Sequence, residues 1–147
     1  MSLNSPSGSG PEAARAAPAG VEAGAVDDVS GAISREIVQV YLRTFGRGPK
    51  RARTFVQPQF SVCVLRDVFT TAERALIAAG EGNAVELGRK RLNAANDDDL
   101  QAIVSGQTGR SVQSHLSHVK VPANLAVHLF LFDQGRTRTE EGDGAER

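Results

Sequence analysis

The spacing of apolar residues changes along the chain, and each change marks a new element. Residues 29–45 repeat apolar side chains at intervals of three and four, which predicts an amphipathic helix with one apolar face. The positions on that face are Ile33, Ile37, Val40, Tyr41 and Thr44. Gly46 is suited to a left-handed helix stop, and Pro49 prevents the helix from resuming.

Two strands are predicted next, over residues 52–57 and 60–66. Only Pro58 and Gln59 separate them, so they should pair as an antiparallel hairpin. In the second strand, alternate residues face opposite sides of a sheet. Both sides are largely apolar, with Phe60, Val62 and Val64 on one and Ser61, Cys63 and Leu65 on the other. This composition predicts an interior strand.

Helical spacing returns after Phe69. Thr70 and Glu73 have the spacing of a capping box, which predicts the start of a short helix that stops at Gly80. A longer helix is predicted over 84–104 and is ended by Gly106. Its predicted apolar stripe consists of Val85, Leu92, Ala95, Leu100 and Ile103. Three adjacent aspartates are poor helix formers, so a break and a second cap are expected near residues 95–98.

Two further strands are predicted over residues 111–119 and 125–132, with a turn between them. Tight connections exclude parallel crossovers, so each strand pair is a hairpin. The order α-β-β-α-α-β-β therefore predicts an α+β fold, a two-layer sandwich with a four-stranded, mostly antiparallel sheet and helices on one face. The second and fourth strands are apolar on both sides. Because an open sheet face should not be this apolar, a homodimer is expected.

Composition and charge divide the chain into three parts. Residues 1–28 and 134–147 lack large apolar side chains and are predicted to be disordered tails flanking one domain over 29–133. The formal net charge is zero, but residues 29–132 hold thirteen basic and eight acidic side chains, so the domain itself is basic. The N-terminal residues lack the order of a signal peptide and no run is long enough to span a bilayer, so a cytoplasmic protein is expected.

Positive charge is densest in the segment that joins the first helix to the first strand. Its candidate anion-binding residues are Gly46, Arg47, Gly48, Pro49, Lys50, Arg51 and Arg53. Three interpretations stay open: a solvated connection, a small-anion or nucleotide site in which glycine lets the backbone approach the ligand, and a nucleic-acid contact. The last is the least favoured because no nucleic-acid recognition motif accompanies the charge. Thr70 and Glu73 would form a structural cap near such a site.

Two charged runs on the predicted long helix are interpreted as solvated faces. Consecutive residues on a helix point about 100° apart, so Asp97–Asp99 cannot converge on one metal ion. For the same reason Arg89–Arg91 should be mostly solvated, although one of the three could join the basic segment in space.

The remaining candidates for chemistry are three histidines and one cysteine. His115 and His118 are three residues apart on a strand and should face opposite sides, whereas His118 and His128 could pair across the last hairpin. Cys63 lies in an apolar run and is predicted to be a small buried residue. No catalytic residue, metal site or cofactor is predicted, and an enzyme is not expected.

Several spaced motifs together resemble a known family. They are Gly46, Gly48 and Pro49 followed by basic residues; Phe69, Thr70 and Glu73; Thr108, Gly109 and Arg110; and the strand from Ala126 to Leu131. The chain resembles the bacterial family named after MpsC, of a sodium-translocating membrane-potential-generating system, although Phe69 stands where that family usually has Leu. The resemblance implies a small cytosolic accessory domain beside a membrane ion or bicarbonate transport component, with no catalytic residue and no cofactor.

Overall fold

The computed structural model describes residues 23–134, and its elements follow the expected order. Their bounds are α2 Ala23–Phe45, β1 Arg51–Val56, β2 Phe60–Arg66, α3 Thr71–Ala78, α4 Gly82–Ala95, α5 Asp97–Thr108, β3 Val112–Lys120, the 3-10 turn η2 Val121–Ala123 and β4 Leu125–Phe132. Residues 23–28, expected to belong to a disordered tail, are helical, because α2 begins six residues before the predicted start. The disorder predicted for 1–22 and 135–147 lies outside the described residues.

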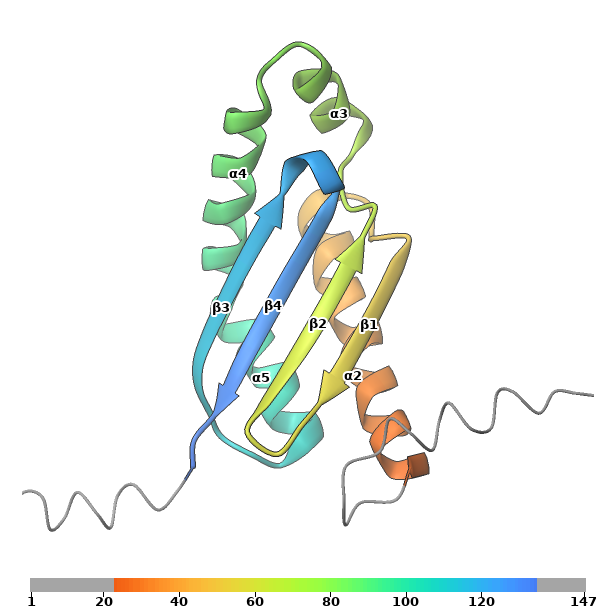
Figure 1. Cartoon of the computed structure of the whole chain (residues 1–147), viewed down its shortest axis with the longest axis vertical. Helices are drawn as coiled ribbons and strands as arrows, with labels where there is room; N and C mark the ends of the chain where they lie inside the picture. The colour runs from red at the N-terminus through yellow and green to blue at the C-terminus, as the bar shows by residue number, and fades with distance from the viewer. Residues whose placement is uncertain (1–22, 135–147) are drawn as a thin grey trace, which may run out of the picture.

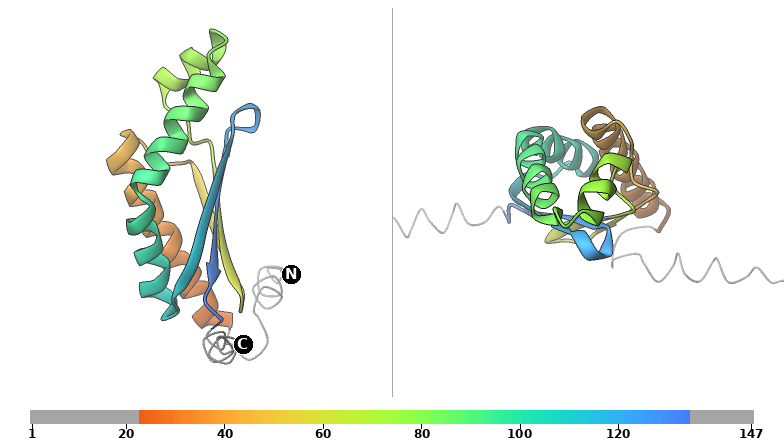
Figure 2. Two further views of the ribbon diagram at one scale, coloured as in Figure 1. Left: turned by 90° about the vertical axis from the view of Figure 1, so that its left-hand side faces the viewer. Right: turned by 90° about the horizontal axis from the view of Figure 1, so that it is seen from above.

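The four strands form one antiparallel sheet in the order β1-β2-β4-β3 (Figure 1). The two strands predicted to be interior, β2 and β4, are indeed the central pair. The helices α2 to α5 lie on one side of the sheet, as Figure 2 shows in its left-hand view. The predicted two-layer α+β architecture is therefore confirmed, and one face of the sheet is left without a helical cover within residues 23–134.

The core lies between the helices and the covered face of the sheet. Along β4, alternate residues from Ala126 to Phe132 are buried, while the residues between them are only half-buried. The largest apolar side chains of the core are Ile33, Ile37, Tyr41, Leu65, Phe69, Leu100, Phe130 and Phe132. Cys63 is fully buried among them, as predicted. Burial of this kind is the main term that stabilises a domain of this size.

The predicted long helix is divided into α4 and α5 at Asn96, which confirms the break expected near the three aspartates. Part of the predicted apolar stripe is wrong. Leu92 is 42% exposed, and the buried residues of α4 are Val85, Arg89 and Asn93. The end of α5 was also placed too early, because it continues to Thr108 and stops at Gly109, which has a φ of 72°.

Two left-handed residues fix the connections at the η2 end of the sheet. Gly46 ends α2 with a φ of +82°, as predicted. Asn124, with a φ of 51°, ends η2, and its side-chain oxygen accepts the backbone N–H groups of Val68 and Phe69 at 2.7 and 3.2 Å. The last hairpin therefore holds the connection between β2 and α3, where the charged groups described next converge.

Candidate functional site

The basic segment before β1 does not form a single cluster. Arg47 donates to the backbone oxygen of Phe69, and its guanidinium lies 3.7 Å from the Asp67 carboxylate. The Lys50 ammonium lies 3.8 Å from the same carboxylate. Arg51 and Arg53 instead belong to β1 and project onto the open face of the sheet, because they alternate with the inward-facing Ala52 and Thr54.

A third cation completes the group around Asp67. Arg74 of α3 donates to the Phe69 oxygen at 3.2 Å and lies 3.7 Å from the Asp67 carboxylate. Three cationic side chains therefore surround one carboxylate, which leaves an excess of positive charge. The ion pairs are partly exposed, with Lys50 at 72%, so each contributes little to stability.

The glycines of the basic segment have structural roles in this arrangement. Gly46 takes the left-handed conformation that ends α2. A β-carbon on Gly48 would lie 3.1 Å from the Val38 side chain, so Gly48 permits close packing against α2. With Pro49 between this contact and β1, the segment is held against α2, and only the basic side chains are left to meet a ligand.

Arg89 is the main correction to the sequence analysis. It was expected to lie on a solvated face with Lys90 and Arg91, but its side chain is fully buried, while its two neighbours are exposed. It donates from Nε and Nη2 to the two carboxylate oxygens of Glu73, at 2.7 and 2.6 Å, and from Nη2 to the Val68 oxygen at 2.6 Å. The guanidinium carbon also lies 3.6 Å from the centroid of the Phe45 ring.

Glu73 serves the capping box and the buried ion pair together. The predicted capping box is confirmed: the Glu73 amide donates to the Thr70 hydroxyl at 3.1 Å, and the Thr70 amide donates to the Glu73 carboxylate at 2.8 Å. Burial alone would raise the pKa of Glu73, but the hydrogen bonds and charge of Arg89, together with the Thr70 amide, hold that pKa below its usual value. Glu73 is therefore ionised opposite a buried cation.

A hydrogen-bonded chain of four polar side chains runs from Asp97 on α5, which is partly exposed, through the core to α2. The Asp97 carboxylate lies 2.5 Å from His115 Nδ1, His115 Nε2 lies 2.9 Å from His128 Nδ1, and His128 Nε2 lies 2.8 Å from the Tyr41 hydroxyl. When both imidazoles are neutral, one arrangement of protons satisfies every contact: each imidazole donates from Nδ1, and the Tyr41 hydroxyl donates to His128.

These hydrogen bonds, together with the strand register, confirm one prediction about the histidines and aspartates and correct two others. His115 and His118 do face opposite sides of the sheet, as predicted. The suggested pairing of His118 with His128 is wrong, because His118 lies opposite Val127 and His128 bonds to His115. Asp97, expected to be a solvated residue, is the carboxylate partner that the sequence did not reveal.

Burial controls the ionisation of this chain. Desolvation and the neighbouring His115 lower the pKa of His128 to about 3, and burial raises the pKa of Tyr41. Burial alone would raise the pKa of Asp97, whereas its bonds to His115 and Gln101 lower it. Burial also raises the pKa of Cys63 to about 11, which keeps its thiol protonated. The titratable groups from Asp97 to Tyr41 are therefore bonded to one another, whereas Ser61 Oγ, Arg89 Nη1 and Asn93 Oδ1 are buried without a hydrogen-bond partner.

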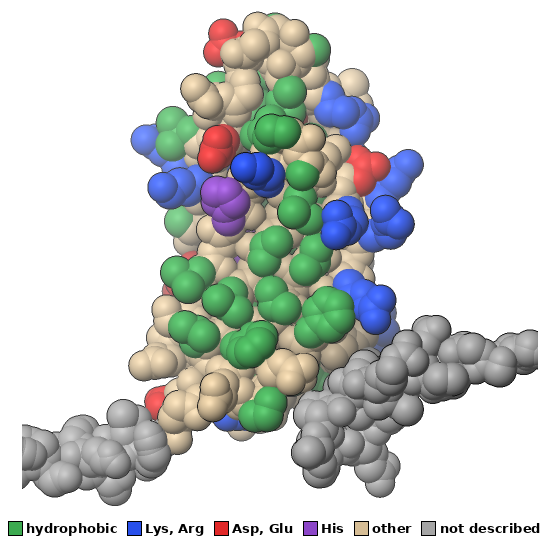
Figure 3. All heavy atoms as spheres, viewed as in Figure 1, with side chains coloured by type: hydrophobic (Ala, Val, Ile, Leu, Met, Phe, Trp, Pro, Cys, Tyr) green, Lys and Arg blue, Asp and Glu red, His purple; other side chains and the backbone are tan. Residues whose placement is uncertain are grey.

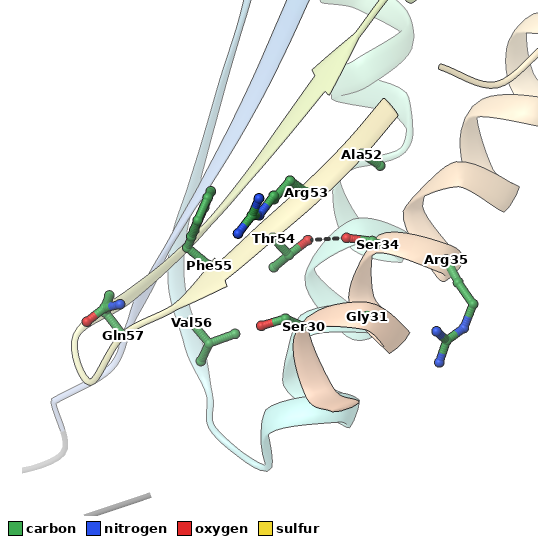
Figure 4. Close-up of a pocket in the computed structure, with 10 residues that line it drawn as sticks. All are labelled: Ser30, Gly31, Ser34, Arg35, Ala52, Arg53, Thr54, Phe55, Val56 and Gln57. Atoms are coloured by element: carbon green, nitrogen blue, oxygen red, sulfur yellow. Dashed lines mark hydrogen bonds between the residues drawn. The ribbon is translucent and has the colours of Figure 1, made fainter. Parts of the chain in front are cut away.

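A narrow groove separates α2 from the edge strand β1 (Figure 4). Ser34 reaches across it, and its hydroxyl lies 2.8 Å from that of Thr54. Gly31 has no side chain to fill the groove on the helix side, and Arg35 points away from the strand in the same view. The groove is lined by polar and apolar side chains, including Arg53, Phe55 and Val56, and holds no pair of groups arranged for catalysis among the residues drawn.

The open face of the sheet exposes several large apolar side chains. Figure 3 shows hydrophobic side chains gathered over the strands, with Lys and Arg side chains beside β1 and toward the η2 end. Leu116 is 54% exposed, and Phe55 and Phe60 are 38% and 36% exposed. A continuous apolar surface of this kind is typical of an interaction site.

Residues 23–134 contain neither a metal-binding group nor a membrane-spanning helix. No three His, Cys, Asp or Glu side chains of this part of the chain are grouped so that they could hold a metal ion. Over the same residues, no helix combines the length and the apolar character that crossing a bilayer requires.

These observations define a two-layer α+β domain with an internally bonded polar core and one open, apolar and basic sheet face. Residues 27–134 match the family model described as the Na+-translocating membrane potential-generating system (MpsC). The match covers most of the chain and all of the sheet, so the chain belongs to this family. No curated protein and no solved structure matches it.

The buried ion pair generates the first prediction. Glu73→Gln keeps an acceptor for the Thr70 amide, since glutamine also completes a capping box, but it removes the counter-ion of Arg89. We expect the free energy of unfolding to fall by about 3 kcal/mol, because a buried charge is left unpaired. Urea unfolding followed by circular dichroism measures this. Arg91→Gln, on the exposed neighbour, should change stability by less than about 0.5 kcal/mol, and equal effects of the two substitutions would contradict the account.

The histidine chain generates a pH prediction. The pKa of His128 is lower in the folded state than in the unfolded chain, so its contribution to stability is present above pH 6.5 and is lost as the pH falls from there toward 3. Between pH 7 and 5 we expect a loss of about 2 kcal/mol from this group. Asp97 and Glu73, whose pKa values are lowered, act in the same direction only at lower pH.

The same urea titration, repeated at pH 7 and pH 5, tests this assignment. His128→Gln should remove most of the difference between the two pH values. His118→Gln provides the matched control, because this histidine is exposed on the open face and should leave the difference unchanged. An unaltered pH dependence in the His128 variant would refute the role given to His128.

Proposed function

We propose that this chain is a non-catalytic accessory or regulatory subunit that acts in the cytosol beside the membrane component of a Na+-translocating membrane-potential-generating system. The observation that carries the proposal is the family match over residues 27–134. It is supported by the core chemistry, since Asp97, His115, His128 and Tyr41 are bonded to one another rather than directed into a cleft. The large exposed surface is suited to binding another protein.

Co-purification tests this function. The full chain carries an affinity tag at its native locus, membranes are solubilised in a mild detergent, and the captured material is analysed by quantitative mass spectrometry. We expect the membrane component of the Na+-translocating system to be enriched over a tagged, unrelated cytosolic domain of the same size. Recovery of the chain without that component, both before and after chemical crosslinking, would contradict the proposal.

A second candidate function is the binding of a small anion at the basic segment. The observation that favours it is the grouping of Arg47, Lys50 and Arg74 around the single carboxylate of Asp67. A shallow depression nearby is lined by Lys50, Arg51, Ala52, Arg53, Phe55, Val64 and Arg66. An anion could therefore exchange with Asp67 or bind beside Arg66, through charge-assisted hydrogen bonds.

Thermal-shift measurements with phosphate, nucleotides and bicarbonate test this second candidate. A ligand at one hundred times its dissociation constant stabilises the folded state by about 2.7 kcal/mol, so a site of useful affinity should raise the melting temperature by several degrees. Arg47→Ala combined with Lys50→Ala should abolish the shift, whereas Lys90→Ala with Arg91→Ala should preserve it. If none of these anions moves the melting temperature, this candidate is rejected.

The homodimer expected from the sequence depends on the same open sheet face. It stays a prediction, and the distribution of charge over that face decides how well a second copy would fit there.

A further inference from the structure

The strand register sorts the open face of the sheet into transverse rows. Successive rows, from the η2 end, are Arg51–Arg66–Leu125–Lys120, Arg53–Val64–Val127–His118, Phe55–Val62–Leu129–Leu116 and Phe60–Leu131–Ser114. The first two rows hold all the cations of this face and are called the basic end. The last two hold none and are called the apolar end. No Asp or Glu occurs in any row.

The exposure of the side chains on this face differs between the central and the edge strands. The central strands β2 and β4 carry half-buried aliphatic residues, such as Val64 and Leu129. The edge strands carry larger exposed side chains, including Phe55 on β1 and Leu116 on β3. At the basic end, a depression over β1 and β2 lies beside Arg66.

The dimensions of this face suit one helix. Four rows two residues apart span roughly 20 Å along the strands, and the outer strands lie about 14 Å apart across the sheet. An α-helix is about 10 Å wide and rises 1.5 Å per residue, so a helix of about 14 residues spans the four rows. Packing a helix on this side would complete the usual layering of a sheet with two apolar faces.

We propose that the open sheet face binds an amphipathic helix of the membrane component, whose apolar stripe covers the apolar end and whose Asp or Glu residues lie over the basic end. This inference rests on the proposed function, which supplies the identity of the partner. The charge of the face supplies the rest: four exposed cations, Arg51, Arg53, Arg66 and Lys120, share their strand rows with no acidic residue. The acidic side chains that Figure 3 shows near the basic end lie beside the rows and not in them.

A second copy of the chain fits this face less well. Full overlap of two faces would bring eight cations into one interface that contains no carboxylate, and unpaired charges are expensive to bury. Overlap of the apolar ends alone would pair only two of the four rows and would leave the cations of both copies without a partner. The chain's own residues 135–147 are rich in acids but include no Val, Leu, Ile or Phe to cover the apolar end.

Site-specific photocrosslinking in cells that carry the whole system tests the proposal. The photoreactive residue p-benzoylphenylalanine is placed at Leu116 or at Phe60 of the full chain. Its matched control position is Leu87, an exposed leucine on the helical side of the domain that is 49% exposed. We expect a covalent adduct with the membrane component from both sheet positions, no adduct from Leu87, and a crosslinked peptide that contains Asp or Glu within an amphipathic segment.

Charge reversal provides the second arm. Arg51→Glu combined with Arg66→Glu should weaken binding of the detergent-solubilised membrane component at least ~10-fold at low salt, and added salt should weaken the wild-type complex as well. Lys90→Glu with Arg91→Glu reverses two exposed cations on α4 and should leave binding within about twofold of wild type. Melting temperatures of the purified variants confirm that both remain folded.

The outcomes separate this inference from the function on which it rests. An adduct between two copies of the chain, a lipid adduct, equal crosslinking from Leu87, or unchanged binding after the Arg51 and Arg66 reversal would each overturn the inference, while wild-type co-purification would leave the function standing. Failure of the wild-type chain to co-purify with the membrane component would instead overturn the function itself.

Discussion

The buried guanidinium of Arg89 is the contact on which the arrangement of the helices depends. It joins α4 to the cap of α3 through Glu73, to the segment that follows β2 through the Val68 oxygen, and to the last turn of α2 through the Phe45 ring. A charge so fully withdrawn from water is tolerated only while its partners stay in place. The four elements are therefore positioned together, and the basic segment that follows α2 is positioned with them.

Polar groups inside the domain are committed to structure, and this determines where function can reside. The chain from Asp97 to Tyr41 occupies the titratable groups between the sheet and the helices, and Glu73 is occupied by Arg89 and Thr70. The side chains that remain available are those of the surface. Among them, the open sheet face combines exposed aromatic and aliphatic residues with cations at one end, which is the pattern of a docking surface rather than of a reaction site.

Features with a local cause could be predicted from the sequence. The capping box at Thr70, the two hairpins, the break near Asp97 and the central positions of β2 and β4 all follow from spacing within a few residues. The buried pairs could not be predicted, because their partners are distant: Glu73 and Arg89 are 16 residues apart, and Tyr41 and His128 are 87 apart. A polar residue on the inner face of a helix resembles a solvated one until its partner is known.

The basic segment illustrates the same limit. Its residues are contiguous in sequence, but Arg47 and Lys50 precede β1 and turn toward Asp67, whereas the alternation of the strand directs Arg51 and Arg53 onto the sheet face. The position at which β1 begins determines which arginine lies beside Asp67 and which lies on the sheet face. The predicted single cluster thus becomes two, one around Asp67 and one on the open sheet face that is proposed to bind the partner.

The central claim is that the domain acts in its system through the open sheet face. The most direct measurement is the Na+-dependent membrane potential of cells that lack the native chain and express either the wild-type chain or Leu116→Glu with Leu129→Glu, at matched and verified levels of folded protein. The account predicts that the double variant lowers the potential to that of cells without the chain, while the exposed helical pair Leu87→Glu and Lys90→Glu retains it. A full potential with the sheet variant would contradict the account.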